Sequence, residues 1–277
     1  MSSEKEIFTI FKNLANTINS SVIPKRKIKI PKGNLLEWDE VEEQFYKIAP
    51  NSIINSNMLI NIEKQKKELL INTKKFCDGL PANNALLWGA RGTGKSSLIY
   101  CIIKELNFKN KVSIIEIKNF QLKSLGKVIR IINSDKKKYI IYCDDLAFDF
   151  NDNNFLYFKS VLDGTLRKNS NCIFYVTSNY RHIVKSDPLV TENQIIQKEN
   201  LESSTALSDR FGLWLGFPSF NEEIYLRIVI NYKKIYNLKI QNSMLRKKAL
   251  QWSILRGSFS GREASNFIKY MVSQKDK

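Results

Sequence analysis

The chain has 277 residues, with 44 Lys and Arg against 27 Asp and Glu, which gives a formal net charge of +17 at pH 7. It contains no apolar run of about 18 residues or more, so we expect no membrane-spanning segment and no membrane partner. One histidine and four singly placed cysteines argue against a histidine-based catalytic relay, a zinc site and a disulfide framework. Hydrolytic chemistry in this chain would have to use carboxylates, a metal ion and cationic side chains.

The excess of positive charge has two explanations. One is an anionic partner such as nucleic acid. The other is genomic bias, because only 10 of the 44 basic residues are Arg and the chain is rich in Lys, Ile and Asn, as A+T-rich genomes encode. The sequence therefore leaves nucleic-acid binding open. The first nine residues are charged and polar and lack a signal-peptide layout, so we expect a cytoplasmic protein.

The chain begins with a segment, residues 1–33, that predicts a short helix and a basic linker. The helix would either lie on its own domain or dock on a partner. The linker runs from Pro24 to Pro31 and is rich in Lys. Residues 35–77 have a polar-rich pattern that predicts helix, with a break at Pro50. The stripe of the first helix consists of Ile7, Phe11, Leu14 and Ile18.

Strands and helices alternate regularly from residue 85. Apolar strand-like runs separated by amphipathic helical segments are typical of an α/β fold with a parallel sheet covered on both faces. After Pro218 only helical segments follow. The sequence predicts an N-terminal helix and basic linker (1–33), an α/β core (34–218) and a helical lid subdomain (219–277). The predicted strands are 85–88, 112–117, 139–143, 172–177 and 213–217, and the predicted helices are 96–107, 121–133, 154–162, 221–236, 244–256 and 261–273.

The segment after the first of these strands matches the phosphate-binding pattern GxxxxGK[ST]. Its glycines let backbone amides surround a phosphate chain, and the following helix adds the positive end of its dipole. Lys95 would supply a charge for the β and γ phosphates, and the Ser96 hydroxyl would bind Mg²⁺. We therefore predict that the chain binds a nucleoside triphosphate. The predicted nucleotide-binding residues are Gly89, Ala90, Arg91, Gly92, Thr93, Gly94, Lys95, Ser96 and Ser97.

Two carboxylates follow the predicted strand 139–143. Asp144 would hold Mg²⁺ directly or through water, and Asp145 stands where a carboxylate could orient and deprotonate an attacking water. Adjacent Asp residues at a strand end are a weak signal alone, since such pairs also cap helices. After a phosphate-binding loop they indicate the acidic motif of a nucleotide hydrolase, the Walker B element.

Three more polar residues are candidates for contact with the γ-phosphate. Asn179 follows the strand 172–177 and could hold the lytic water, or it could be an ordinary turn asparagine. Arg210 could reach the γ-phosphate of a neighbouring subunit, and Arg262 could contact phosphate bound by its own chain. Either arginine could instead be a surface salt-bridge partner.

The order of these motifs resembles that of AAA+ ATPases. More narrowly, ANNALLWGARGTGKSS from Ala82, CDDLAFD from Cys143, VLDGTL from Val161, TSNYRH from Thr177 and LSDRFGLWLGF from Leu207 resemble a bacterial AAA+ family of unknown function, the domain of unknown function 815. The resemblance covers about residues 35–275 and implies an AAA+ type P-loop NTPase fold, ATP as ligand and an oligomeric active site. AAA+ proteins usually have glutamate where this chain has Asp145, so the resemblance also implies slow hydrolysis.

The leading hypothesis is a Mg²⁺-dependent AAA+ ATPase that works as a homo-oligomer and remodels an unknown protein client. The alternative is a DNA-associated loader or adaptor that switches on ATP and hydrolyses it weakly, which the short Asp145 side chain and the basic N-terminal segment favour. A small-molecule P-loop kinase would need an acceptor-binding insertion and an Arg-rich lid, and the sizeable insertion at 184–205 has few arginines. The predicted catalytic residues are Asp145, Asn179, Arg210 and Arg262.

Overall fold

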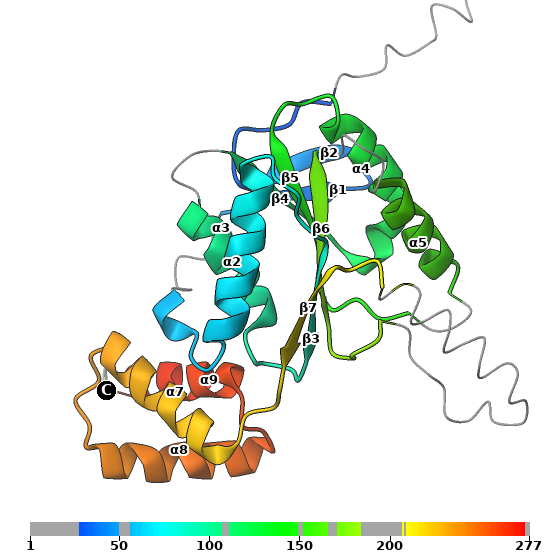
Figure 1. Cartoon of the computed structure of the whole chain (residues 1–277). Helices are drawn as coiled ribbons and strands as arrows, with labels where there is room; N and C mark the ends of the chain where they lie inside the picture. Colours follow the sequence, from blue (N-terminus) through cyan, green and yellow to red (C-terminus); the bar gives the residue numbers. More distant parts are fainter. Residues whose placement is uncertain are drawn as a thin grey trace, which may run out of the picture.

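A seven-stranded sheet with the order β2-β1-β4-β5-β6-β3-β7 organises the chain (Figure 1). The computed structural model describes residues 28–49, 56–106, 111–148, 152–165, 171–183, 207 and 209–274, so the helix predicted around residues 7–18 lies outside the described residues. The five strands predicted from residue 85 onward are present and pair in parallel. The strands are β1 Leu35–Asp39, β2 Gln44–Lys47, β3 Ala85–Gly89, β4 Val112–Ile117, β5 Lys138–Cys143, β6 Cys172–Ser178 and β7 Leu213–Phe217.

Residues 35–47 form two strands where the polar-rich sequence predicts helix, and this prediction is wrong. Leu36 and Trp38 are buried on β1 and Phe45 is buried on β2, so apolar and polar residues alternate at the period of a strand. The Asp39 carboxylate accepts hydrogen bonds of 2.9 Å from two amides of the intervening turn. β1 joins β4 in parallel and β2 runs antiparallel to β1, so the sheet is mixed at this edge.

Most helical bounds agree with the predicted ones to within a few residues. The segment predicted as helix 121–133 instead begins as the 3-10 helix η3, and its α-helix α4 starts only at Leu125. In the part of the chain that the structure describes, no helix is long and apolar enough to cross a bilayer. The helices are η1 Ser56–Met58, α2 Glu63–Cys77, α3 Lys95–Leu106, η3 Asn119–Ser124, α4 Leu125–Ile132, α5 Asn153–Thr165, α7 Glu222–Ile235, α8 Asn242–Arg256 and α9 Gly261–Ser273.

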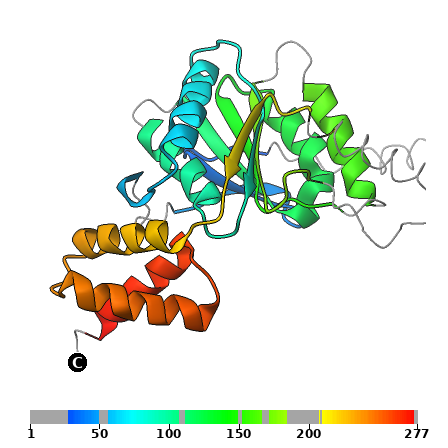
Figure 2. The ribbon, with the colours of Figure 1, turned by 60° about the horizontal axis from the view of Figure 1, so that its bottom comes forward.

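Helices cover both faces of the sheet (Figure 2). Helices α4 and α5 pack on one face, and α2 and α3 pack on the other. On β5, Ile141 and Cys143 belong to the α4/α5 core, whereas Ile140 and Tyr142 belong to the α2/α3 core. Because side chains alternate along a strand, the residue that follows Cys143 points toward α3. This places Asp144 on the side of the sheet where the phosphate-binding loop lies.

The helices α7, α8 and α9 form a separate helical unit beside the α/β core (Figure 1). Their own apolar cluster includes Tyr225, Leu245 and Phe267, and it also takes in Met58 from η1. Asn221 caps α7 by accepting a 2.9 Å hydrogen bond from the Ile224 amide. The lid boundary at residue 218 stays a prediction, and η1 is a core segment that packs against the lid.

Candidate functional site

The loop between β3 and α3 has a backbone shape that depends on glycine. Gly89, Gly92 and Gly94 have φ angles of 130°, 71° and 100°, which other residues rarely adopt. A Cβ atom on Gly89 would lie 2.0 Å from the carbonyl oxygen of Phe217, the last residue of β7. The Ala90 amide donates a 3.0 Å hydrogen bond to that same oxygen. The start of the loop is therefore fixed against the end of β7.

Lys95 begins α3 and turns its side chain back into this loop. Its ammonium donates hydrogen bonds to the carbonyl oxygens of Gly89 at 2.7 Å and Ala90 at 2.8 Å, and to the Asn179 side-chain oxygen at 3.3 Å. Lys95 is only 8% exposed. Burial lowers the pKa of Lys95 from 10.5 to about 8, although two nearby carboxylates act in the opposite direction. An anionic ligand beside this ammonium would favour its charged form.

Asp144 lies directly opposite the first turn of α3. One of its carboxylate oxygens, Oδ1, accepts hydrogen bonds from the Ser96 hydroxyl at 2.8 Å and from the Thr177 hydroxyl at 2.5 Å. The Thr177 oxygen in turn accepts a 2.8 Å hydrogen bond from the Asp145 amide. Thr177 thus connects the two acidic residues to β6, and it fixes the carboxylate next to the serine that the sequence predicts as a metal ligand.

Asp145 and Asn179 form a second polar pair. The Asn179 side-chain amide donates a hydrogen bond to the Asp145 carboxylate, while its oxygen accepts from Lys95. Asp145 has a φ of 49°, a left-handed conformation that Asp tolerates better than most residues. With this turn, the Asp144 carboxylate contacts Ser96 and Thr177, whereas the Asp145 carboxylate contacts Asn179. The structure therefore brings Asn179 between the loop lysine and the predicted general base.

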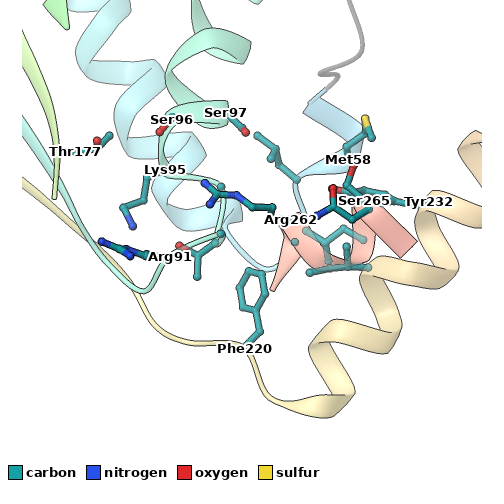
Figure 3. Close-up of a pocket in the computed structure, with 18 of the residues that line it drawn as sticks. Met58, Arg91, Lys95, Ser96, Ser97, Thr177, Phe220, Tyr232, Arg262 and Ser265 are labelled. Carbon is teal, nitrogen blue, oxygen red and sulfur yellow. The ribbon is translucent and has the colours of Figure 1, made fainter. Parts of the chain in front are cut away.

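These side chains line one cavity of about 570 Å³ between the sheet and the C-terminal helices (Figure 3). Its polar part is formed by loop residues 91–97, the two acidic residues, Thr177 and Asn179. Another part is apolar, which suits contact with a planar base, and α9 adds the polar residues Ser265, Asn266 and Lys269 beside it. The apolar lining residues are Met58, Leu59, Ile60, Phe220, Ile228 and Tyr232.

The first turn of α9 touches the phosphate-binding loop. The Gly261 amide donates a 2.8 Å hydrogen bond to the Gly92 carbonyl oxygen. A Cβ atom on Gly92 would lie 2.8 Å from the Cβ of Ser260, the residue that caps α9. Arg262 follows and lines the cavity, with its side chain beside the loop in Figure 3. Arg262 therefore lies beside the phosphate-binding loop, and its contact with phosphate stays a prediction.

Arg210 lies apart from these residues. Its guanidinium forms an ion pair with Asp163 of α5, in which Nη2 lies 3.5 Å from Oδ2 and Nε donates to Oδ1. Arg210 is not among the residues that line the cavity. Arg210 therefore does not belong to the cavity of its own chain. Its role at the nucleotide of a neighbouring subunit stays a prediction.

A protein family described as "Protein of unknown function (DUF815)" matches residues 32–275. The chain belongs to this family. Holliday junction branch migration complex subunit RuvB of Phytoplasma mali (strain AT) is 21% identical to this DUF815 protein over 222 residues, which are 79% of the chain and 63% of that RuvB.

Two solved structures resemble the DUF815 protein. Aeropyrum pernix ORC1 in complex with DNA has a TM-score of 0.52 and 15% identity, over 78% of the DUF815 chain and 61% of the ORC1 chain. The Thermotoga maritima RuvB Holliday junction branch migration motor has a TM-score of 0.46 and 13% identity, over 75% and 69% of the two chains. The fold is the AAA+ type of P-loop NTPase, as the order of motifs predicts.

The donors in the cavity of the DUF815 protein suit a magnesium ion that arrives with a nucleotide. No group of three or more His, Cys, Asp or Glu side chains in the described ranges could hold a metal without help. Ser96 and Asp144 offer one hydroxyl and one carboxylate, and Mg²⁺ is commonly held by one or two such groups, water and substrate phosphates. The buried Tyr142 hydroxyl, which has no hydrogen-bond partner in the described part of the chain, belongs to the residue two positions before Asp144. The residues present therefore fit the ion.

Sequence reasoning missed Thr177, and the structure gives Asn84, a residue of the quoted family motif, a structural role. Thr177 is the first polar residue after the apolar part of β6, and this change from apolar to polar is the signal that could have identified it. Asn84, in the loop-proximal motif of the DUF815 resemblance, supports the sheet instead. Its side-chain oxygen accepts a 2.9 Å hydrogen bond from the Phe174 amide, and its carbonyl accepts one of 3.1 Å from Leu213.

The buried ammonium of Lys95 predicts a specific pH dependence. In protein without nucleotide, the charged form destabilises the fold below pH 8, and this cost is relieved as the pH rises from about 8 towards 10.5. We expect the free energy of unfolding of the wild type to gain about 2 kcal/mol relative to Lys95→Met between about pH 7 and about pH 9.5. Urea unfolding of both proteins at the two pH values measures this gain. The same pH dependence in both would contradict the lowered pKa.

Proposed function

We propose that the protein is a Mg²⁺-dependent ATPase of the AAA+ type that drives remodelling of an unknown partner. The observation that carries this proposal is the convergence of Lys95, Ser96, Asp144, Asp145 and Asn179 on one cavity. The first two residues belong to the phosphate-binding loop and α3, and the others follow two neighbouring strands. These are the groups that a P-loop enzyme needs to bind phosphate and metal and to activate a water.

Each residue has a role that follows from its contacts. Lys95 would exchange its bonds to loop carbonyls for the β and γ phosphates, and the phosphate charge would restore the ammonium to its usual pKa. Ser96 and Asp144 would hold Mg²⁺, which when bound neutralises charge on the phosphates. Asp145 would accept the proton of the attacking water, and Asn179 would orient this carboxylate.

The lid would connect nucleotide binding to movement. Arg262 lines the same cavity as the loop, and Gly261 is hydrogen-bonded to the loop backbone. Contact between Arg262 and the γ-phosphate would therefore favour one lid position while ATP is bound, and hydrolysis would remove that contact. The apolar end of the cavity draws on α7 as well as η1, so base contacts would stabilise the same closed arrangement.

Asp145→Asn is the first test of this proposal. The amide keeps the size of the carboxylate but cannot accept a proton, so we expect ATP and Mg²⁺ binding to be retained and the hydrolysis rate to fall by about 100-fold or more. Lys95→Ala serves as the comparison, because it should abolish ATP binding instead. Calorimetric titration with ATP and a phosphate-release assay measure the two effects. Wild-type turnover in Asp145→Asn would move the general base to another residue.

Arg210 carries the proposal that the active site is shared between copies of the chain. Asp163 neutralises Arg210 within its own chain, and the pair is partly exposed, with side chains 36% and 42% accessible. A neighbouring copy that offers a γ-phosphate would be a stronger anionic partner for the guanidinium than one carboxylate. Arg210 would then act in trans, while Asp163 would hold it in the isolated chain.

Mixing two inactive variants tests this arrangement. Arg210→Ala and Lys95→Ala should each be inactive, since an arginine finger contributes about 10³ to 10⁵ in rate in related phosphoryl transfer. In a mixture, some interfaces pair an intact loop with an intact arginine, so we expect part of the phosphate-release activity to return. A mixture that stays inactive, together with wild-type activity that does not depend on protein concentration, would assign Arg210 a role within its own chain.

A second candidate function is a DNA-associated loader or adaptor with weak hydrolysis. Helix α8 favours it, because its sequence contains no carboxylate and its basic residues are exposed. The RuvB relative is named as a subunit of a Holliday junction branch migration complex, which makes DNA a reasonable partner to propose. The basic segment 25–27 that also suggested this role lies outside the described residues. The exposed basic residues of α8 are Arg246, Lys247, Lys248 and Arg256.

Removal of charge from α8 distinguishes a DNA site from a general excess of charge. We expect replacement of Arg246, Lys247 and Lys248 by Gln to weaken binding to duplex DNA and to lower the salt dependence, log Kd against log salt concentration, by about 2 to 3. The matched control replaces Lys67, Lys74 and Lys75 of α2 by Gln. Fluorescence anisotropy over a range of salt concentrations reports both quantities. An equal loss in both triple variants would mean that net charge alone attracts the DNA.

A further inference from the structure

The Tyr142 hydroxyl is a buried polar group without a hydrogen-bond partner. Tyr142 is fully buried on β5, and its oxygen makes no hydrogen bond with any residue that the structure describes. A buried hydroxyl that gave up its bonds to water without gaining others is costly to the fold, so an unpartnered group of this kind calls for an explanation. Tyr139 on the same strand provides the contrast, because its hydroxyl donates a 2.5 Å hydrogen bond to Asp135.

The ring of Tyr142 is held in a defined place. The Tyr100 ring of α3 packs edge-on against it, with 5.5 Å between the ring centroids. Tyr100 is itself fixed by a 2.9 Å hydrogen bond to Glu116, the residue that is paired with Tyr142 on β4. The position of the Tyr142 hydroxyl is therefore set by the packing of its ring against Tyr100.

The hydroxyl is directed toward the predicted metal site. Tyr142 and Asp144 are two residues apart at the end of β5, so both lie on the α3 side of the sheet. Asp144 and Ser96 both lie close to the Tyr142 hydroxyl. A tyrosine hydroxyl can donate a hydrogen bond, so this one is a possible donor beside the two predicted metal ligands.

The Asp144 carboxylate can accept more hydrogen bonds than the two described above. Ser96 and Thr177 both donate to the same carboxylate oxygen, Oδ1. A carboxylate has several acceptor positions on its two oxygens, and those that face a metal need hydrogen bonds behind them to fix their orientation. The Tyr142 hydroxyl lies near this carboxylate and has no other hydrogen-bond partner among the described residues.

We propose that Tyr142 is a positioning residue of the metal site, whose hydroxyl donates a hydrogen bond to the Asp144 carboxylate when the divalent cation of the nucleotide is bound. The proposal rests on the proposed function, because it assigns Tyr142 to the Mg²⁺ that accompanies ATP. The hydroxyl would be unpaired in the metal-free fold and paired in the metal-bound one. Its cost to the fold would thus be offset by tighter binding of the metal and nucleotide.

Tyr142→Phe and Tyr139→Phe form a matched pair for the test. Each variant removes one hydroxyl from a buried tyrosine of β5. The affinity for a fluorescent ATP analogue is measured with Mg²⁺ and with EDTA, and direct binding of Mn²⁺ to the nucleotide complex is followed by electron paramagnetic resonance. Urea unfolding in EDTA gives the stability of each variant.

We expect Tyr142→Phe to weaken Mg²⁺-dependent nucleotide binding and Mn²⁺ binding by about 10-fold or more, as is typical when the partner of a metal ligand is removed. Its affinity in EDTA should not change, and its resistance to urea should stay the same or increase, because no hydrogen bond is lost. Tyr139→Phe should show the reverse pattern, with lower resistance to urea and unchanged metal-dependent affinity.

Two results would overturn the proposal while leaving the proposed function intact. One is wild-type Mg²⁺-dependent affinity in Tyr142→Phe. The other is an equal loss of affinity with Mg²⁺ and with EDTA, which would mean that Tyr142 acts through the fold of the loop. If the wild type binds nucleotide in neither condition, or gains no affinity from Mg²⁺, the proposed function itself fails, and the role of Tyr142 fails with it.

Discussion

The close approach of the phosphate-binding loop to the end of β7 is the constraint on which the site depends. Gly89 leaves β3 so near the Phe217 carbonyl oxygen that a Cβ atom would lie 2.0 Å from it, and the Ala90 amide is hydrogen-bonded to the same oxygen. The chain passes from Phe217 into the lid within a few residues. The Phe217 peptide group thus contacts the start of the loop and lies just before the helices of the lid. It therefore connects the two sides of the cavity.

A network of short polar contacts extends from this fixed point across the ends of the strands. Lys95, Asn179 and Asp145 form one series of hydrogen bonds, and Ser96, Asp144 and Thr177 form another. Lys95 is buried among carbonyl oxygens, which accept its hydrogen bonds but do not neutralise its charge, and its pKa is lowered as a result. A bound phosphate would neutralise the Lys95 charge. Relief of this buried charge would then contribute to the affinity for an anion.

Much of the site could be predicted from the sequence because its chemistry requires contiguous patterns. The loop glycines, Lys95 and the Asp pair each belong to a strand-end motif, and parallel strands bring such motifs to one edge. The strands of residues 35–47 were missed, since only a few alternating apolar residues distinguish them from a polar helix. The apolar end of the cavity is assembled from residues in and around η1 and α7, and no local pattern predicts such distant packing. Likewise, nothing near Arg210 in the sequence indicates Asp163 as its partner.

The contact between Gly92 and Gly261 is made by backbone atoms alone, with the amide of one bonded to the carbonyl of the other. No side chain would have to change rotamer if this contact broke on nucleotide binding. Any larger residue at position 92 would meet Ser260, and a Cβ at position 261 would lie 3.1 Å from the Gly92 oxygen. Sequence change at either position is therefore limited by the other, so the loop and the lid can stay in backbone contact only while both positions keep a small residue.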